Sequence, residues 1–242
     1  MRKIFQVFSV TAALLSIALF SPGASFAYTA ITLGYDFSYP NCSATLPTDG
    51  SFEILGTTGG RAFTNNSCLG TEFNTFTSGT QTFYMNLNAA VGSTASNANL
   101  GPKQCKKNDK ACQNYNYGWQ AAKSASDYAM QQTGTASAMW WFDIETNNSW
   151  TSSTSVNQQV IQGAHDYLAI TYNVPSGVYS TPAMWQSVTG GWQNGMPVWY
   201  ATGKTTATDA ATYCSSSFTG GIVYLSQYIS GGFDHDYACV SN

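Results

Sequence analysis

Charged side chains are scarce in this sequence. Asp, Glu, Lys and Arg make up 9% of the 242 residues, where about a quarter is usual. Arg2 and Lys3 lie in the first 27 residues, which leaves seven basic residues against twelve acidic ones in the remainder. Arg61 is the only arginine in that remainder, and four of the lysines lie between residues 103 and 110. A surface that neutralises phosphates needs clustered Lys and Arg, so the composition argues against a nucleic-acid partner.

The sequence has only one long apolar run, at its amino terminus. Residues 1–27 comprise a short basic start, an apolar stretch over residues 4–20 and a small-x-small end at Ser25 to Ala27. This order is typical of a secretory signal peptide cleaved before Tyr28, although an uncleaved anchor would begin in the same way. No later run approaches ~18 apolar residues. We predict a signal peptide at residues 1–27 and one domain at residues 28–242 of a protein that is secreted, extracellular or cell-wall associated.

Histidine is rare, and two common motifs are missing. His165 and His235 are the only histidines and no CxxC pair occurs, so we expect no metal site. No G-x-S-x-G is present, as a Ser-His-Asp hydrolase would need. All six cysteines lie in residues 28–242, and an even number in an oxidising compartment predicts three disulfides. Because neighbours in sequence close short loops at the lowest entropic cost, the expected pairs are Cys42–Cys68, Cys105–Cys112 and Cys214–Cys239.

Short β-type runs alternate with longer helical stretches. The expected strands are residues 31–37, 52–57, 82–86, 138–145, 177–180, 197–201 and 221–227. Helices are expected at residues 117–132, which are rich in alanine, and at 153–170, where an apolar stripe recurs at helical spacing. The alternation predicts an α/β fold. We expect a single compact, partly irregular (β/α) TIM-type barrel stabilised by disulfides, with an open doubly wound sheet as the alternative.

The first expected strand has two unlike faces. Alternate residues are small or polar: Thr32, Gly34 and Asp36. The residues between them are apolar or aromatic: Ile31, Leu33, Tyr35 and Phe37. In a barrel we expect the apolar face to meet the surrounding helices and the small face to fill the interior. Asp36 should then lie near the carboxyl-terminal mouth of the barrel.

The strongest local signal is a hydrophobic run over residues 139–145 that ends in two acids. Asp143 and Glu145 are separated by one residue, so they share a face of a strand, ~6.6 Å apart along the backbone. Like charges this close raise one pKa, which gives a site one protonated and one ionised carboxyl group. Trp141, on the same face, is expected to desolvate the pair and to stack on a sugar ring. This pattern suits glycoside hydrolysis, although a structural or calcium-binding role for the acids is the alternative.

A second acidic segment follows a glycine-rich turn near the carboxyl terminus. Asp234 and Asp236 flank His235, and they either line the same mouth or cap a terminal turn held by Cys239. Aromatic residues, 14% of the chain, fall at many expected strand ends and loops. As a set they favour a carbohydrate ligand.

Several strand motifs follow one another in a recognisable order. They are Gly34-Tyr35-Asp36, Phe52-Glu53-Ile54-Leu55, Phe83-Tyr84-Met85-Asn86, Trp141-Phe142-Asp143-Ile144-Glu145, Gly177-Val178-Tyr179-Ser180, Val198-Trp199-Tyr200-Ala201, and Gln227-Tyr228 followed by Phe233-Asp234. In this order the sequence resembles the family-25 glycoside hydrolases, which are secreted N-acetylmuramidases with an irregular (β/α) barrel. The chain departs from that family where the second strand ends, because Gly56-Thr57-Thr58-Gly59-Gly60 stands in place of a basic residue and a Thr-Glu-Gly.

The resemblance implies hydrolysis of peptidoglycan between N-acetylmuramic acid and N-acetylglucosamine. Glu145 then corresponds to the general acid, Asp143 to its partner, and Asp36 and Asp234 to further mouth carboxylates. The resemblance implies no metal or organic cofactor, and we expect a monomer that binds peptidoglycan or a related glycan. The expected substrate-binding residues are Trp141, Tyr84, Tyr179, Trp199, Tyr228 and Asp236.

Two other functions remain open from the sequence. A barrel that binds cell-wall glycan without cutting it would fit the missing second-strand acid and the abundant aromatic residues. A secreted structural protein with no glycan ligand is the other. A chitinase-type D-x-x-D-x-D-x-E motif is incomplete, because only its last two acids, Asp143 and Glu145, are present.

Overall fold

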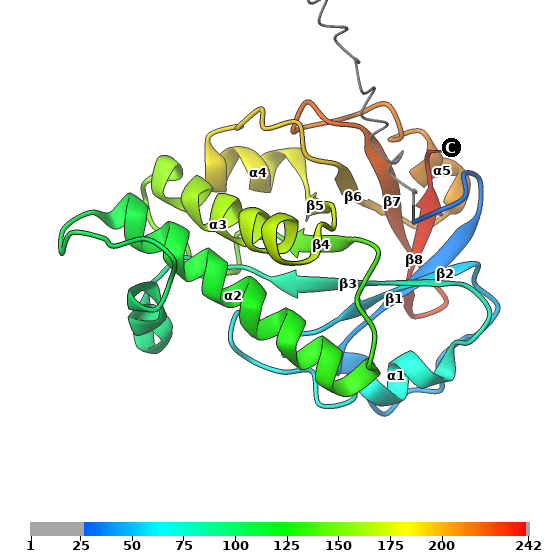
Figure 1. The fold of residues 1–242 in the computed structure, drawn as a ribbon. Coiled ribbons are helices and arrows are strands. Elements are labelled where there is room, and N and C mark those ends of the chain that lie inside the picture. Colours follow the sequence, from blue (N-terminus) through cyan, green and yellow to red (C-terminus); the bar gives the residue numbers. More distant parts are fainter. Residues whose placement is uncertain (1–26, 241–242) are drawn as a thin grey trace, which may run out of the picture.

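Eight strands form a closed barrel in the computed structural model, which describes residues 27–240 (Figure 1). The predicted signal peptide therefore lies outside the described residues except for Ala27. The strands are β1 (Leu33–Phe37), β2 (Phe52–Gly56), β3 (Thr80–Asn86), β4 (Trp140–Asp143), β5 (Ser176–Ser180), β6 (Val198–Lys204), β7 (Val223–Ser230) and β8 (Phe233–Ala238). Strands β1 to β7 are parallel to their sequence neighbours, and β8 runs antiparallel to both β7 and β1. The predicted irregular barrel is confirmed, and the open sheet is wrong.

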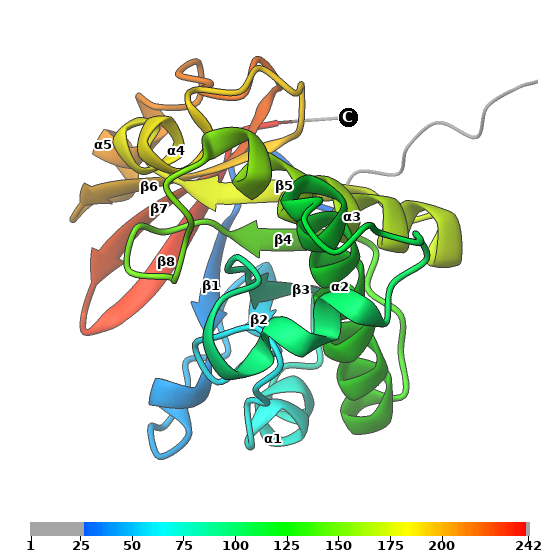
Figure 2. The ribbon, with the colours of Figure 1, turned by 90° about the vertical axis from the view of Figure 1, so that its left-hand side faces the viewer.

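Helices occupy the connections unevenly. The α-helices are α1 (Leu69–Thr75), α2 (Lys110–Thr133), α3 (Thr154–Tyr172), α4 (Pro182–Thr189) and α5 (Ala207–Ala211), with short 3-10 helices η1 (Tyr39–Asn41) and η2 (Gly92–Asn99). The two predicted helices correspond to α2 and α3, which are the longest and lie side by side along one side of the barrel (Figures 1 and 2). No α-helix follows β1, and β7 and β8 are joined by a hairpin.

Strand β8 was not predicted from the sequence. Its residues were predicted only to line the mouth or to cap a turn, whereas they form a strand that pairs with both β1 and β7. Gly231 and Gly232, both at positive φ, make the two-residue turn before it. Two such glycines between alternating runs are a hairpin signal, because the tight turns that suit strand twist require positive φ at both positions.

The apolar face of the first strand is only partly covered. Phe37 is buried in the outer core, but Ile31 and Leu33 are 78% and 42% exposed. Ile31 lies before the strand begins, with φ at 65°. The expectation that helices would cover this whole face is therefore wrong, because no α-helix connects β1 to β2.

Aromatic side chains fill the interior of the barrel. Trp141, Trp199 and Phe52 are fully buried there with Ile54 and Leu225. Below them Tyr28 closes the amino-terminal end of the barrel. Its hydroxyl oxygen accepts a hydrogen bond from the Trp141 indole at 2.8 Å and lies 2.6 Å from the Thr82 hydroxyl. The first residue of the predicted mature chain is therefore part of the core.

Helices α2 and α3 approach each other at two glycines. A Cβ on Gly118 would lie 1.9 Å from the Val160 carbonyl oxygen, and one on Gly163 would lie 2.0 Å from the Tyr115 carbonyl oxygen. Only glycine allows this separation, because the neighbouring atoms are backbone and cannot move aside. The helix pair thus depends on two positions where any side chain would push it apart.

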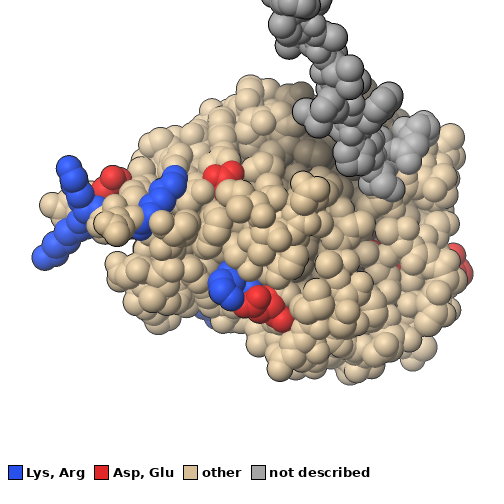
Figure 3. Space-filling view, viewed as in Figure 1, with Lys and Arg blue, Asp and Glu red and all other residues tan. Residues whose placement is uncertain are grey.

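Three disulfides join the predicted partners: Cys42–Cys68, Cys105–Cys112 and Cys214–Cys239. Each disulfide joins two cysteines that are consecutive in the sequence, which keeps the closed loop short and its entropic cost low. Charged side chains occupy only a few places on the face shown in Figure 3, which agrees with the low charge content. Among the described residues, no helix combines the length and hydrophobicity needed to cross a membrane.

We expect Gly118→Ala to lower the free energy of unfolding by ~1–3 kcal/mol or more, because the added methyl group forces α2 away from α3. Urea unfolding followed by circular dichroism would measure it. Gly70→Ala in α1 is the comparison variant, because its Cβ would make a tight contact at 3.3 Å with the Gln132 carbonyl oxygen and not a 1.9 Å overlap, and because alanine favours a helix. Equal stability of the two variants would contradict the packing argument.

Candidate active site

An open cleft lies beside the carboxyl ends of β3 and β4. Its volume is about 440 Å³, and it is lined by Tyr39, Gly60, Arg61, Tyr84, Asn86, Asp143, Glu145, Asn147, Asn148 and Ser149. Two of the predicted catalytic acids, Asp143 and Glu145, and one predicted substrate-binding residue, Tyr84, therefore meet in one hollow. A polar cleft at the carboxyl ends of barrel strands is where this architecture usually places its chemistry.

Asp143 ends β4 and points into the barrel mouth. Its Oδ2 accepts a short hydrogen bond from the side-chain amide of Asn86, the register partner on β3. Its Oδ1 is buried with no hydrogen-bond partner among the described residues. Burial raises the pKa of Asp143 well above its usual value, the nearby Glu145 and Asp36 raise it further, and the Asn86 hydrogen bond opposes the rise. Asp143 is thus a carboxyl group that holds a proton easily.

Glu145 lies two residues beyond the end of β4, in a loop that is held in place by its backbone. The Trp150 indole donates to the Glu145 carbonyl oxygen at 2.8 Å, and the Ser180 hydroxyl donates to the Ile144 carbonyl oxygen at 2.7 Å. The predicted strand over residues 138–145 is too long, since β4 spans only Trp140–Asp143. Glu145 is half-buried and lines the cleft, and burial raises its pKa.

Asp36 and Asp234 face each other across the β1–β8 pair. They are register partners, and Asp36 is 7% exposed. The Gln227 side-chain amide donates to Asp36 Oδ2 at 2.8 Å. Burial, with the charge of Asp234, raises the pKa of Asp36 to about 8. Burial also raises the pKa of Asp234, and the charge of His235 opposes the rise.

Asp236 lies deeper in the barrel and is fully buried. Its Oδ1 accepts a hydrogen bond from the Trp199 indole at 2.6 Å. Burial raises the pKa of Asp236 well above its usual value, the charge of Asp36 raises it further, and the Trp199 hydrogen bond opposes the rise. The Asp236 Oδ2 is buried with no hydrogen-bond partner among the described residues. Asp236 supports Asp36 from below and does not line the cleft.

The predicted aromatic binding residues occupy different depths. Tyr84 lines the cleft, and Tyr179 lies near it, where its hydroxyl donates to Gln227 Oε1 at 2.8 Å. Trp141 and Trp199 are buried in the barrel interior, so neither indole offers a face for a sugar ring. Tyr228 points to the outside of the barrel, where it stacks on His235 with ring centroids 5.0 Å apart.

Sequence reasoning missed four residues of this region. Asn86 and Gln227 hydrogen bond to the acids from inward positions of β3 and β7, and Tyr39 and Arg61 line the cleft. Amide side chains are so common in this sequence that no single one stands out. Arg61 carries a signal, because it is the only arginine after residue 27.

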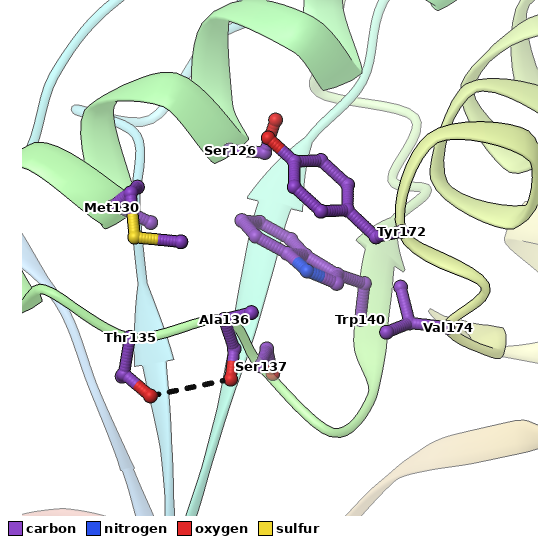
Figure 4. Close-up of a pocket in the computed structure, with 9 residues that line it drawn as sticks. Ser126, Met130, Thr135, Ala136, Ser137, Trp140, Tyr172 and Val174 are labelled. Carbon is purple, nitrogen blue, oxygen red and sulfur yellow. Dashed lines mark hydrogen bonds between the residues drawn. The ribbon is translucent and has the colours of Figure 1, made fainter.

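A second hollow lies between α2, α3 and the start of β4, away from the acids (Figure 4). Its walls include Met130, Trp140, Tyr172 and Val174, which are mostly apolar. Its volume of about 10 Å³ has room for about one water molecule and excludes a sugar. The cleft beside β3 and β4 is therefore the candidate active site.

Two further acids are buried outside the barrel, near α1. Glu53 is fully buried, and its Oε1 has no hydrogen-bond partner among the described residues. Glu72 accepts a hydrogen bond from the Asn66 amide at 2.7 Å. Burial raises the pKa of Glu53 to about 8 and that of Glu72 to about 7. Sequence reasoning did not single out either residue.

One group of side chains in the described part of the chain has metal-ligand spacing. It consists of Glu72 with Cys42 and Cys68. The two sulfur atoms are bonded to each other, so they offer no thiolates to an ion.

The sequence profile described as Lysozyme-like protein 1 matches residues 76–219, more than half of the chain. The chain belongs to this family. The matched segment of this lysozyme-like chain contains Asp143 and Glu145, whereas Asp36, Asp234 and Asp236 lie outside it. No curated protein was found to match the sequence.

Solved structures share the fold of this lysozyme-like chain at low sequence identity. A muramidase from Acremonium alcalophilum is 17% identical, with a TM-score of 0.57 over 86% of this chain and 93% of its own. A lysozyme from Streptomyces coelicolor is 17% identical, with a TM-score of 0.56 over 88% and 94%. A family 25 glycosyl hydrolase from Bacillus anthracis is 9% identical, with a TM-score of 0.58 over 87% and 90%. These structures share the fold over a larger part of the chain than the residues that the family profile matches.

We expect folding stability to fall as the pH rises. The pKa of Glu53 rises from 4.5 to about 8 on folding, so above about pH 4.5 the unfolded chain loses a proton that the folded protein keeps. Stability from this group is complete below about pH 4.5 and is lost by about pH 8. Glu53→Gln should reduce the fall in melting temperature between pH 5 and 8.

The control for this measurement is Asp49→Asn, which replaces an exposed acid. Its melting temperature should fall between pH 5 and 8 as steeply as that of the unaltered protein. Identical pH profiles for Glu53→Gln and the unaltered protein would show that burial of Glu53 does not set the pH dependence.

Proposed function

We propose that residues 28–242 form a secreted muramidase that cleaves peptidoglycan between N-acetylmuramic acid and N-acetylglucosamine. The observation that carries this proposal is the placement of Asp143 and Glu145 together in the cleft at the barrel mouth. Membership of a lysozyme-like family and a fold shared with muramidases support it.

Glu145 is the proposed general acid. It reaches the cleft, and burial raises its pKa, so it carries a proton at a pH where an exposed glutamate would not. It would give this proton to the oxygen that leaves when the glycosidic bond breaks, and would later take one from the attacking water. Such proton transfer typically contributes ~10²–10⁴-fold in rate.

Asp143 is the proposed partner of the acid. It lies deeper than Glu145 and is held by the Asn86 amide, so its position is fixed relative to the reacting sugar. In its ionised form it would accept the N–H of the substrate acetamido group or stabilise the intermediate. Net retention would follow through either an enzyme carboxylate or the neighbouring acetamido group.

Asp36 and Asp234 are the proposed further acids of the mouth, and Asp236 supports them from below. Tyr84, which lines the cleft, and Tyr179, the register partner of Asp143 on β5, would contact the substrate. We further propose that the protein acts as a monomer outside the cell or at the cell wall. It would have no nucleic-acid partner, and no membrane contact once residues 1–27 are removed.

Glu145→Gln should lower the release of soluble products from insoluble peptidoglycan by at least ~10²-fold, because glutamine has no proton to give. Mass spectrometry of the soluble fraction would detect muropeptides with a reducing-end N-acetylmuramic acid. Glu72→Gln is the matched control, since it makes the same change in a buried glutamate outside the cleft. Full activity of Glu145→Gln would mean that another group is the acid.

Asn86→Ala should move the acid side of the pH–activity profile to higher pH. The Asn86 hydrogen bond lowers the pKa of Asp143, so its loss lets Asp143 keep a proton to higher pH. The measurement is kcat/KM against pH, with melting temperature as the check on folding. A uniform loss of activity with an unmoved profile would show that Asn86 only positions the cleft.

A further inference from the structure

Arg61 projects its charge into the cleft from a fixed backbone. Its carbonyl oxygen accepts from the Thr64 hydroxyl at 2.6 Å, and the next amide, of Ala62, donates to Asn88 Oδ1 at 3.2 Å. The side chain is exposed and lines the same hollow as Asp143 and Glu145. The only arginine after residue 27 thus lies beside the proposed acids.

The charge of Arg61 is not neutralised by the protein. Within residues 27–240 the one ion pair is Lys123–Asp127, so Arg61 has no carboxylate partner there. Its guanidinium is therefore open to a ligand.

The turn that presents Arg61 also holds an aromatic ring at the cleft rim. Gly60 has φ at 85°, and a Cβ there would lie 3.1 Å from the ring of Tyr39. Tyr39 is 48% exposed and lines the cleft. Glycine at position 60 therefore lets a planar ring and a planar cation occupy neighbouring places on one rim.

We propose that Arg61 binds a carboxylate of the glycan substrate, and this inference rests on the proposed function. A guanidinium matches a carboxylate with two parallel N–H donors, and charge-assisted hydrogen bonds are among the stronger polar contacts. Peptidoglycan offers carboxylates from two sources. They are the peptide attached to muramic acid, and the lactyl group of muramic acid where the peptide has been removed.

The direct test is binding to the Glu145→Gln protein, which keeps ligands uncut. Isothermal calorimetry would compare Glu145→Gln with Glu145→Gln/Arg61→Gln for three soluble ligands. These are a peptide-bearing muropeptide, the same saccharide with the peptide removed, and the muropeptide with every carboxylate converted to an amide. Glu145→Gln/Lys204→Gln is the control, because Lys204 is a cation that does not line the cleft.

We expect loss of Arg61 to weaken binding about tenfold or more for a ligand that carries the recognised carboxylate. The amidated ligand should bind the two proteins equally, and Glu145→Gln/Lys204→Gln should match Glu145→Gln throughout. A loss confined to the peptide-bearing ligand identifies the peptide as the source. A loss confined to the peptide-free ligand identifies the lactyl group.

Two outcomes would overturn the inference: equal weakening for all three ligands, which indicates a structural role, or no weakening for any of them. The proposed function is judged separately by product release from the unaltered protein. Release of muropeptides with no effect of Arg61 on binding would leave the function standing and remove the role of Arg61. Binding that depends on Arg61, with no release of muropeptides by the unaltered protein, would leave the role of Arg61 standing and remove the proposed function.

Discussion

The barrel must hold several carboxyl groups in its interior without a cation to neutralise them. Asp36, Asp143 and Asp236 are all buried, and no ion pair reaches them within the described residues. A buried carboxylate is costly unless it is hydrogen-bonded or protonated. Here the amides of Asn86 and Gln227 and the indole of Trp199 provide the hydrogen bonds, and the raised pKa values provide the protonation. Glycoside hydrolysis uses one protonated carboxyl group beside an ionised one. In the cleft, burial raises the pKa of Glu145, while the Asn86 hydrogen bond opposes the rise at Asp143.

The antiparallel strand β8 carries two acids of this region, Asp234 and Asp236. Between β7 and β1 it closes the barrel and sets Asp234 opposite Asp36 in register. Gln227 of β7 and Asp236 of β8 are also register partners; the Gln227 amide donates to Asp36, and the charge of Asp36 raises the pKa of Asp236. The same strand pairings that close the sheet therefore also bring Asp36, Asp234 and Asp236 together. The pair Asp143 and Glu145 comes from the opposite, fully parallel part of the barrel.

The sequence predicted what depends on local periodicity and short loops. The strand order, the barrel, the disulfide pairs and the acids of β4 follow from alternation, charge scarcity and loop entropy, and the structure agrees for the barrel and the disulfides. It could not predict contacts between strands distant in sequence. The depth of Trp141 depends on Tyr28 below it, and the hydrogen bonds of Asn86 and Gln227 depend on register. Burial of Glu53 follows from the packing around β2 and α1 and leaves no local trace in the sequence.

Tyr28 links maturation to the integrity of the fold. Its ring packs on Phe52 with centroids 4.8 Å apart, and its hydroxyl contacts Trp141 and Thr82. If a signal peptidase cuts after Ala27, it leaves the new α-amino group on the residue that closes the barrel floor. A cut a few residues downstream would remove that closure and let water reach the indoles beneath the acids. The position of cleavage would then determine whether the barrel core is closed at its amino-terminal end.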